Sequence, residues 1–249
     1  MNFIPQIKKY LQARHFNAVQ PVAALIDMDG TLYDSMGNHA SAWHRMVTEL
    51  GIDMPRDEFY MYEGRTGAAT LDIIFQRAYG RNATDEEKTE LYHRKTVYFQ
   101  ELPDVNPMPG AQQMIDTLIK AGLRRVLVTG SGQSSLINRL DNDFPGAFTP
   151  QLRVTSRDVT KGKPHPEPFL RAMQLASVRP SQAIAIENAP LGVKSACDAG
   201  AFTIAVTTGP IPREALEEAG AAVIFSSMQE CADNIHMLLL QLLTTTLDS

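Results

Sequence analysis

Two acidic side chains stand two residues apart, directly after a continuous apolar run. Residues 22–26 form the run, and Asp27 and Asp29 follow it. Such a run is typical of a strand buried on both faces of a parallel sheet, and we predict a strand over 22–29. Residues i and i+2 of an extended chain point the same way, so both carboxylates are expected to project into one small space. Close like charges favour a bound divalent cation, oxygen ligands suit Mg²⁺, and Gly30 permits a tight turn after the site.

Two other interpretations compete for this acidic pair. An EF-hand calcium loop would need a third acidic position, which is missing here, and a preceding helix in place of the predicted strand. A solvated turn that happens to carry two acidic residues is the second alternative. The choice between these interpretations depends on the polar residues elsewhere in the chain.

Polar residues also follow two later apolar segments. Residues 125–128 lead into the sequence Thr-Gly-Ser-Gly, whose N–H and hydroxyl groups could bind an anion at a helix N-terminus, and residues 183–186 lead into Glu-Asn, which offers oxygen ligands. The loop Lys-Gly-Lys-Pro-His-Pro at 161–166 presents cations and is stiffened by its prolines. If these groups meet at one edge of a sheet, they form a site suited to phosphoryl transfer, because a metal and a lysine can neutralise the negative charge on the transferred group. The candidate phosphate-binding residues are Thr129, Gly130, Ser131 and Lys163.

Helical and extended patterns alternate from residue 105 onward, as in a doubly wound parallel sheet. The predicted fold class is therefore α/β, and ligands of such sheets bind at the carboxyl ends of the strands. Further strands are predicted at 125–129, 152–155, 183–186, 203–206 and 222–225. Helices are predicted at 112–120, 134–140, 168–176, 191–199, 213–219 and 227–243.

The segment directly after the first strand has a different pattern. Over residues 37–102 apolar residues recur every three or four positions, and glycines and prolines separate the repeats. We therefore predict a Rossmann-like core domain of residues 1–36 and 103–249, with an inserted small α-helical bundle, the cap domain, at 37–102. A short amphipathic helix is predicted within residues 1–20, and Trp43 is predicted to lie in an apolar core.

The composition argues against several classes of protein. A net charge of −5 argues against a broad nucleic-acid-binding surface. No apolar run approaches the length of about 18 residues that a membrane span needs, and residues 1–21 lack the apolar segment of a secretory signal. Cys197 and Cys231 have no metal-ligand spacing and are expected to be reduced, buried thiols of a cytoplasmic protein.

The sequence resembles the haloacid dehalogenase superfamily of phosphotransferases, specifically the β-phosphoglucomutase-like branch that has a small helical cap. Four motifs of that family occur in order, and the resemblance covers about residues 22–230. The motifs are Asp-Met-Asp-Gly-Thr at 27–31, the threonine at 129, Lys-Pro at 163–164 and Glu-Asn-Ala-Pro-Leu-Gly at 187–192.

The resemblance implies a role for each motif residue. Asp27 would be the nucleophile that forms an aspartyl-phosphate, and Asp29 would be the general acid and base. Thr129 and Lys163 would hold the phosphoryl group. The family usually has aspartate in place of Asn188, so the loss of this charge is expected to weaken metal binding or to shift it to the preceding glutamate. Mg²⁺ is the implied cofactor, and its candidate ligands are Asp27, Asp29, Glu187 and Asn188.

The predicted cap holds four further candidate substrate residues, His39, Glu63, Arg65 and Lys95. His39 and Lys95 match a hinge-side histidine and a phosphate-contacting lysine of β-phosphoglucomutase, although each is equally well explained as an ordinary helix residue. The loop Glu-Gly-Arg-Thr-Gly at 63–67 lies where the specificity loop of the family meets the active site, and Arg65 stands two positions away from the mutase arginine. The same loop and the Glu-Asn pair occur in a similar subgroup that includes an inorganic pyrophosphatase.

These features predict a cytoplasmic, Mg²⁺-dependent phosphohydrolase that acts through an aspartyl-phosphate on pyrophosphate or a sugar phosphate. The expected partner is a small phosphorylated substrate, with no nucleic acid and no membrane, and the chain is expected to be a monomer or weak dimer. The alternative is a β-phosphoglucomutase that interconverts β-glucose 1-phosphate and glucose 6-phosphate. A non-catalytic phosphate-binding protein is disfavoured because binding alone does not need both Asp27 and Asp29, and a true dehalogenase needs neither a metal nor the second aspartate.

Overall fold

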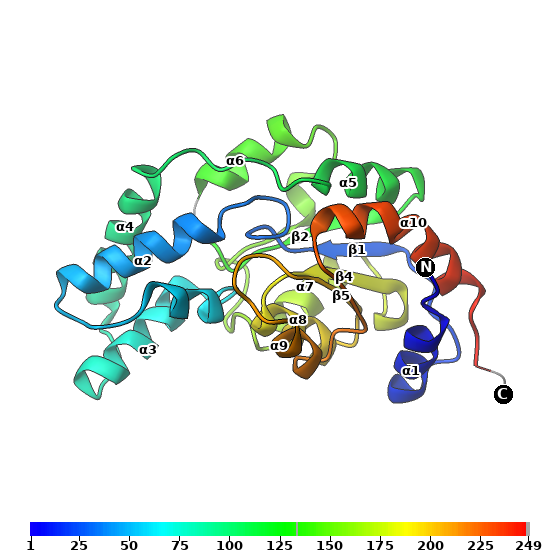
Figure 1. Cartoon of the computed structure of the whole chain (residues 1–249), viewed down its shortest axis with the longest axis horizontal. Helices are drawn as coiled ribbons and strands as arrows, with labels where there is room; N and C mark the ends of the chain where they lie inside the picture. Colours follow the sequence, from blue (N-terminus) through cyan, green and yellow to red (C-terminus); the bar gives the residue numbers. More distant parts are fainter. Residues whose placement is uncertain (133, 248–249) are drawn as a thin grey trace.

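A computed structural model describes residues 1–132 and 134–247, and its centre is a six-stranded sheet (Figure 1). The strands lie in the order β3-β2-β1-β4-β5-β6, and every neighbouring pair is parallel. This arrangement confirms the predicted α/β fold with a Rossmann-like parallel sheet. The strands are β1 (Ala23–Ile26), β2 (Arg124–Val128), β3 (Arg153–Val154), β4 (Ala183–Glu187), β5 (Phe202–Val206) and β6 (Val223–Phe225).

Strand β1 lies in the middle of the sheet and sets the position of the acidic pair. Its last residue, Ile26, pairs with Leu127 of β2 and Ile186 of β4, so the carboxyl ends of these three strands meet at one edge. The strand is shorter than the predicted 22–29 because the chain leaves the sheet for a tight turn. Gly30 has a φ of 81° in this turn, a conformation that favours glycine.

Helices cover both faces of the sheet, and successive residues of each strand contribute to opposite cores. The helices outside the inserted segment are α1 (Ile4–Arg14), α5 (Ala111–Lys120), α6 (Ser134–Asp143), α7 (Glu167–Leu175), α8 (Pro190–Asp198), α9 (Arg213–Glu218) and α10 (Met228–Thr244), with short 3-10 turns at Pro150–Leu152 and Pro180–Gln182. Ala24 and Ile26 pack with residues of α1, α5, α6 and α10, whereas Ala23 and Leu25 pack with residues of α7 and α8. Burial on both faces explains why the strands are continuous apolar runs.

Four helical elements separate β1 from α5 and lie together at one end of the molecule (Figure 1). They are α2 (Met36–Glu49), the 3-10 helix η1 (Arg56–Tyr62), α3 (Gly67–Tyr79) and α4 (Asp85–Gln100). Trp43 is buried among their apolar side chains, as predicted, and this cluster continues into Val193 of α8. The inserted segment is therefore packed against the sheet-bearing part, and its division into a separate cap domain at 37–102 stays a prediction.

The start of α4 is fixed by a capping box. Thr84 Oγ1 accepts a hydrogen bond from the N–H of Glu87 at 3.2 Å, and the Glu87 carboxylate accepts one from the N–H of Thr84 at 2.7 Å. These two bonds satisfy N–H groups that the first helical turn leaves unpaired. The helix start matters for the site because α4 carries Tyr92 and Lys95 on its inner side.

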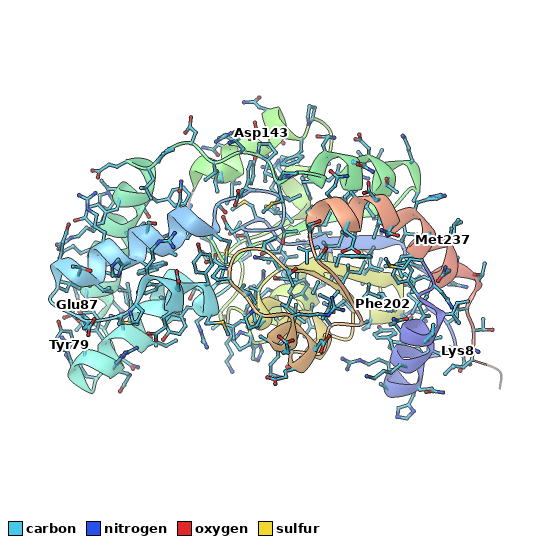
Figure 2. All side chains as sticks on the ribbon, in the orientation of Figure 1. Lys8, Tyr79, Glu87, Asp143, Phe202 and Met237 are labelled. Carbon is cyan, nitrogen blue, oxygen red and sulfur yellow. The ribbon has the colours of Figure 1, made fainter. Side chains whose placement is uncertain are left out.

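Side chains fill the space between the sheet and its helices, where Phe202 of β5 is buried and Met237 of α10 reaches the surface (Figure 2). Within the described residues, both cysteines are buried and neither forms a disulfide. No helix in the same part of the chain combines the length and the apolar character that a membrane crossing requires.

Candidate active site

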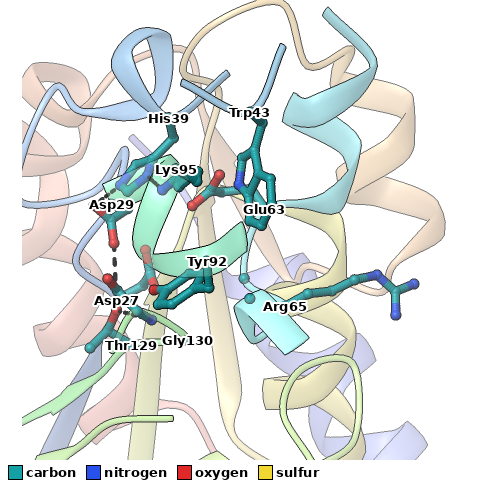
Figure 3. Close-up of a pocket in the computed structure, with 13 residues that line it drawn as sticks. Asp27, Asp29, His39, Trp43, Glu63, Arg65, Tyr92, Lys95, Thr129 and Gly130 are labelled. Carbon is teal, nitrogen blue, oxygen red and sulfur yellow. Dashed lines mark hydrogen bonds and ion pairs between the residues drawn. The ribbon is translucent and has the colours of Figure 1, made fainter. Parts of the chain in front are cut away.

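The acidic pair lies in a pocket between the strand ends and the inserted helices (Figure 3). The pocket brings together most of the predicted site residues, whereas Lys163, Glu187 and Asn188 lie beside it. Its lining comes from the ends of β1 and β2, from α2 and α4, and from the loop before α3. The lining residues are Asp27, Asp29, His39, Trp43, Glu63, Gly64, Arg65, Gly67, Tyr92, Lys95, Thr129, Gly130 and Ser131.

Asp27 is buried and pairs with a lysine from a distant loop. Lys163 Nζ lies 2.6 Å from Asp27 Oδ1 and 2.5 Å from Glu187 Oε1, and it donates to the carbonyl of Val128 at 3.0 Å. Burial opposes the charge of this lysine, but the two carboxylates raise the pKa of Lys163 above its ordinary value. Burial and the Glu187 carboxylate raise the pKa of Asp27, against the lowering effect of Lys163. One lysine therefore does not offset both carboxylates that it bridges.

Glu187 is fixed by the start of α8. Its Oε2 accepts hydrogen bonds from the N–H groups of Asn188 at 3.0 Å and Ala189 at 3.1 Å. A Cβ atom on Gly192 would lie 1.8 Å from Glu187 Oε1, so only glycine fits at this position. The close approach of α8 to the Glu187 carboxylate thus explains why the Glu-Asn-Ala-Pro-Leu-Gly motif ends in glycine.

Asp29 is held by Ser35 and by a histidine of α2. Asp29 Oδ1 accepts a hydrogen bond from Ser35 Oγ at 2.7 Å and lies 2.9 Å from His39 Nε2, while His39 Nδ1 lies 2.6 Å from Lys95 Nζ. An ammonium group can only donate, so Nδ1 accepts from Lys95 and Nε2 carries the proton that is donated to Asp29. Burial alone would raise the pKa of Asp29, but His39, Ser35 and Lys95 hold it below its ordinary value. Asp29 is therefore kept ionised.

Lys95 is buried among three aromatic rings as well as beside His39. Its Nζ lies 5.4 Å from the ring centre of Trp43, 5.9 Å from that of Tyr92 and 5.3 Å from that of Phe99. Burial lowers the pKa of Lys95 to about 8. Burial and the neighbouring Lys95 charge lower the pKa of His39, in agreement with a neutral imidazole that passes one hydrogen bond on to Asp29.

Glu63 points into the same pocket from the loop before α3 (Figure 3). Ligand atoms of Glu63, Asp29 and His39 all lie within 4.8 Å of one another. Burial and the charge of Asp29 raise the pKa of Glu63 above its ordinary value. The loop approaches the strand end closely, because a Cβ atom on Gly130 would lie 2.3 Å from the carbonyl oxygen of Gly64. Glycine at position 130 is needed for this contact.

Several polar groups of the Thr-Gly-Ser-Gly loop already form hydrogen bonds within the protein. Thr129 Oγ1 accepts a hydrogen bond from the N–H of Ser131 at 3.0 Å and lies 3.5 Å from Asp29 Oδ2. The N–H of Gly132 donates to the hydroxyl of Tyr92 at 3.3 Å. Thr129, Gly130 and Ser131 do line the pocket, so their position agrees with the predicted phosphate site, but an incoming phosphate would have to replace these internal bonds.

The side chains of Asn188 and Arg65 do not point into the pocket. Asn188 Oδ1 accepts from Thr31 Oγ1 at 3.3 Å, and its Nδ2 donates to Thr208 Oγ1 at 3.0 Å. A Cβ atom on Gly30 would lie 2.1 Å from Asn188 Nδ2, so the amide is packed tightly over the turn. Arg65 extends away from the two aspartates (Figure 3).

The family follows from a comparison with known proteins. A family model of haloacid dehalogenase-like hydrolases matches residues 24–206, the greater part of the chain, including Asp27, Lys163 and Glu187. The chain belongs to the haloacid dehalogenase-like hydrolase family. The predicted superfamily and the prediction of an enzyme are thereby confirmed.

Several proteins are similar to this haloacid dehalogenase-like chain over most of their length. Hexitol phosphatase A of Escherichia coli is 30% identical over 184 residues, which cover 73% of this chain and 81% of that protein. The β-phosphoglucomutase of Bacillus subtilis is 29% identical over 196 residues, which cover 75% of this chain and 84% of that protein. A solved Bacteroides vulgatus structure that carries the provisional name β-phosphoglucomutase is 42% identical, covers 98% of both chains and has a TM-score of 0.93. These similarities confirm the β-phosphoglucomutase-like branch, whereas the pyrophosphatase subgroup stays a prediction.

The donor atoms of this haloacid dehalogenase-like site fit a divalent cation. Four carboxylates meet around the pocket while two ammonium groups offset them, which leaves two negative charges uncompensated. Buried carboxylates in excess must take up protons or a cation. Carboxylate oxygens are the ligands that Mg²⁺ prefers, so the predicted cofactor suits the charge and the donor type. The carboxylates are Asp27, Asp29, Glu63 and Glu187, and the ammonium groups are Lys95 and Lys163.

The sequence did not indicate three residues that contribute to the site, namely the pocket residues Trp43 and Tyr92, which helical spacing could have found, and Ser35, which holds Asp29. Trp43 lies four residues after His39 on α2, and Tyr92 lies three residues before Lys95 on α4, so each pair shares a helix face. Trp43 is therefore a core residue and a pocket residue at once. Ser35, the third, carries no such signal, because its contact with Asp29 depends on the turn between them.

Proposed function

We propose that this protein is a Mg²⁺-dependent phosphohydrolase that forms an aspartyl-phosphate on Asp27 and acts on a small phosphate substrate, either pyrophosphate or a sugar phosphate. The observation that carries the proposal is the arrangement of two buried carboxylates at the end of β1. Asp27 pairs with Lys163, and Asp29 is held ionised by Ser35 and His39. Two carboxylates in such different surroundings suit two different roles.

In the proposed reaction, a carboxylate oxygen of Asp27 attacks phosphorus, and the bond from phosphorus to the leaving oxygen breaks. Asp29, which is ionised at rest, takes up a proton from solvent and gives it to the leaving oxygen, and it then accepts a proton from the water that hydrolyses the aspartyl-phosphate and returns that proton to solvent. Two easier displacements replace one difficult displacement. Positioned proton transfer of this kind contributes roughly a hundredfold to ten-thousandfold in rate.

Lys163 and the metal would together neutralise the negative charge of the transferred phosphoryl group. Asp27, Asp29, Glu187 and Asn188 are the ligands implied by the family resemblance, and the cluster of Asp29, His39 and Glu63 adds a carboxylate on the other side of the pocket. When bound, Mg²⁺ would polarise the phosphoryl oxygens as a Lewis acid. Lys163 already bridges Asp27 and Glu187 and would keep the nucleophile oriented.

The pocket is small in this arrangement of the inserted helices. The side chains leave a cavity of about 30 Å³, and one water molecule needs about 10–15 Å³ by this measure. Both pyrophosphate and a hexose phosphate would need the pocket to open, and the hexose phosphate would need the larger opening. Glu63 also points inward, and in its ionised form it would repel a bare second phosphate by about 4 kcal/mol at about 4 Å, with an effective dielectric of about 20. A carboxylate there is tolerated if it contacts a metal on the substrate or a protonated leaving phosphate.

The second candidate function is a β-phosphoglucomutase, which the identities to proteins of that name favour. The names of other relatives, hexitol phosphatase A of Escherichia coli and 2-deoxyglucose-6-phosphate phosphatase 1 of Saccharomyces cerevisiae, support the sugar-phosphate form of the first proposal.

A panel of substrates tests the proposal. Phosphate release with Mg²⁺ is measured for pyrophosphate, hexose 6-phosphates and an aryl phosphate, and conversion of β-glucose 1-phosphate is measured with a bisphosphate primer. We expect the highest kcat/KM for pyrophosphate or another small phosphate. Efficient primed conversion to glucose 6-phosphate with negligible pyrophosphate hydrolysis would decide for the mutase.

Glu63→Gln is expected to lower the rate on pyrophosphate by roughly tenfold or more, since one charged contact is lost. The rate on an aryl phosphate, which has no second phosphate to contact this residue, is expected to fall less. Glu86→Gln is the matched control, because Glu86 is exposed on α4 and is not among the residues that line the pocket. Equal losses on both substrates would contradict the assigned contact.

Asn188→Asp is expected to tighten Mg²⁺ binding by roughly tenfold, because a charged oxygen replaces a neutral one. The dissociation constant is measured by calorimetric titration of the metal-free protein, so that the readout does not depend on activity. Asn106→Asp adds the same charge at an exposed position and serves as the control. An unchanged constant for Asn188→Asp would remove this residue from the metal ligands.

We also propose that residues 37–102 act as a cap that closes over residues 1–36 and 103–249 during turnover, which would exclude water from the reaction. His39 and Lys95 would then connect the two parts, since both belong to the inserted helices. His39 contacts Asp29 directly, and Lys95 contacts His39. The cytoplasmic location and the monomeric or weakly dimeric state stay predictions.

A further inference from the structure

A second groove opens beside the acidic pocket, between the start of α3 and the loop that precedes α7. Its volume is about 480 Å³. Four side chains that can carry positive charge line it, namely Arg65, Lys161, Lys163 and His165, and of these Lys163 is paired with Asp27 and Glu187. The single carboxylate of its lining belongs to Asp198, which is paired with Lys194 at 2.9 Å. The groove is therefore positively charged on balance, in contrast to the neighbouring pocket.

Arg65 faces this groove with an uncompensated charge. Its carbonyl oxygen packs on the strand-end loop, where a Cβ atom on Gly130 would lie 3.0 Å from it, but its side chain extends away from the aspartates (Figure 3). The Nε atom is buried and has no hydrogen-bond partner among residues 1–132 and 134–247. Within the same residues no carboxylate forms an ion pair with Arg65, whereas Arg45, Arg77 and Arg81 each form at least one. Burial lowers the pKa of Arg65, as expected for a cation without a counter-charge.

Lys161 lies on the opposite wall of the groove, in a loop of fixed shape. The Glu167 carboxylate accepts hydrogen bonds from the N–H groups of Thr160 at 2.6 Å and Lys161 at 3.0 Å. These main-chain bonds hold the loop and occupy the nearby carboxylate. The ammonium group of Lys161 forms no ion pair in the described part of the chain, and its side chain is exposed.

The two walls of the groove touch below it. A Cβ atom on Gly162 would lie 2.8 Å from Thr66 Cγ2, and one on Gly64 would lie 3.1 Å from Lys163 Cδ. A ligand held between the walls would therefore connect the loop that presents Glu63 to the loop that presents Lys163. Both of these residues face the acidic pocket side of the contact, so occupancy of the groove would favour the packed arrangement of the two loops.

We infer that this groove binds an oxyanion, a phosphate group by chemical class, between the Arg65 guanidinium and the Lys161 ammonium. A guanidinium presents two parallel N–H groups to two oxygens of such an anion, and an ammonium adds a point charge. The groove falls in the range of about 300–1,000 Å³ that small-molecule sites occupy, so there is room for an organic part attached to the phosphate. The inference does not depend on the proposed hydrolysis, because the two side chains assigned to the anion, Arg65 and Lys161, have no role in the proposed reaction, whereas Lys163 lines the groove but directs its ammonium group to Asp27 and Glu187.

Nuclear magnetic resonance titration of the full-length, metal-free protein tests the site. Inorganic phosphate and glucose 6-phosphate are titrated separately, and the reporters are the Arg65 Nε–H signal and the amide signals of Thr66 and Gly162. We expect saturable shifts of all three signals. The amide signals of Thr129 and Gly130 report binding in the acidic pocket, so binding there is distinguished from binding in the groove.

The two ligands distinguish the possible sources of the phosphate group. Saturation with both would identify a bare oxyanion as sufficient, and saturation with glucose 6-phosphate alone would identify a phosphate ester whose organic part adds contacts. Either result supports the site. Shifts confined to the acidic pocket, or a drift that never saturates with either ligand, would overturn it.

Variants give a second, independent readout. Arg65→Gln and Lys161→Gln are each expected to weaken binding in the groove about tenfold or more, because each removes a charged hydrogen bond. Arg171→Gln, which removes a positive charge from an exposed residue of α7 outside this groove, is expected to leave the affinity unchanged. Equal affinity in all three variants would show that the shifts do not arise from the proposed contacts and would overturn the site.

Discussion

Asp27→Asn is expected to lower kcat by at least about a thousandfold, because an amide cannot act as the attacking nucleophile. The substitution keeps the size of the side chain, and Lys163 retains Glu187 as a partner. Turnover is measured on the best substrate of the panel with saturating Mg²⁺. The aspartyl-phosphate is measured in parallel by acid quenching with a radiolabelled substrate, and label on the protein is expected only with Asp27 intact.

Asp34→Asn is the matched control for this result. It is the same chemical change seven residues later, at an exposed position. Activity close to that of the unchanged protein is expected for it, and a thermal unfolding curve shows whether either variant is folded. Near-normal turnover by a folded Asp27→Asn protein would rule out covalent catalysis at this residue.

Removal of divalent metal is expected to abolish phosphate release, and added Mg²⁺ is expected to restore it. The physical reason is the excess of two negative charges among the buried carboxylates and lysines around the pocket. Ca²⁺ is expected to inhibit, because it prefers more ligands at longer distances than the octahedral Mg²⁺ site offers. Activity is measured in excess chelator and after readdition of each ion.

Stability gives a test of the same metal that does not require turnover. A ligand that binds only the folded state raises its stability, so Mg²⁺ is expected to raise the Tm of the metal-free protein. The increase is expected to be smaller in Asp27→Asn, which lacks one of the carboxylates. Full activity in excess chelator, together with a Tm that does not respond to Mg²⁺, would contradict the metal assignment.

The sheet and the location of the acidic pair were predictable from local patterns. A strand buried on both faces needs apolar side chains at every position, and this leaves a continuous run that can be seen in the sequence. Polar residues directly after such runs must lie at the carboxyl edge of a parallel sheet, which placed Asp27, Thr129 and Glu187 near one another. The end of β1 was less predictable, because the turn at Gly30 depends on the amide of Asn188 packed against it.

Contacts made by the inserted helices depended on the tertiary structure. Helical periodicity predicts which residues share a face of α2 or α4, but it contains no information on which strand end that face meets. The chain from His39 to Lys95 and the inward direction of Glu63 depend on how these helices pack over β1 and β2. The two-position offset of Arg65 acquires a meaning only when its side chain is seen to leave the pocket.

The sequence by itself therefore determined the fold class, the family and the two aspartates, because these depend on periodicity and on short motifs within single segments. The tertiary structure decided which charges meet. Lys163 pairs with Asp27, which lies 136 residues earlier in the chain, and the groove beside Arg65 combines two segments that are far apart in the sequence. Electrostatic interactions act through space between segments that are far apart in the sequence. The balance of positive and negative charges in the site therefore depends on the folded structure.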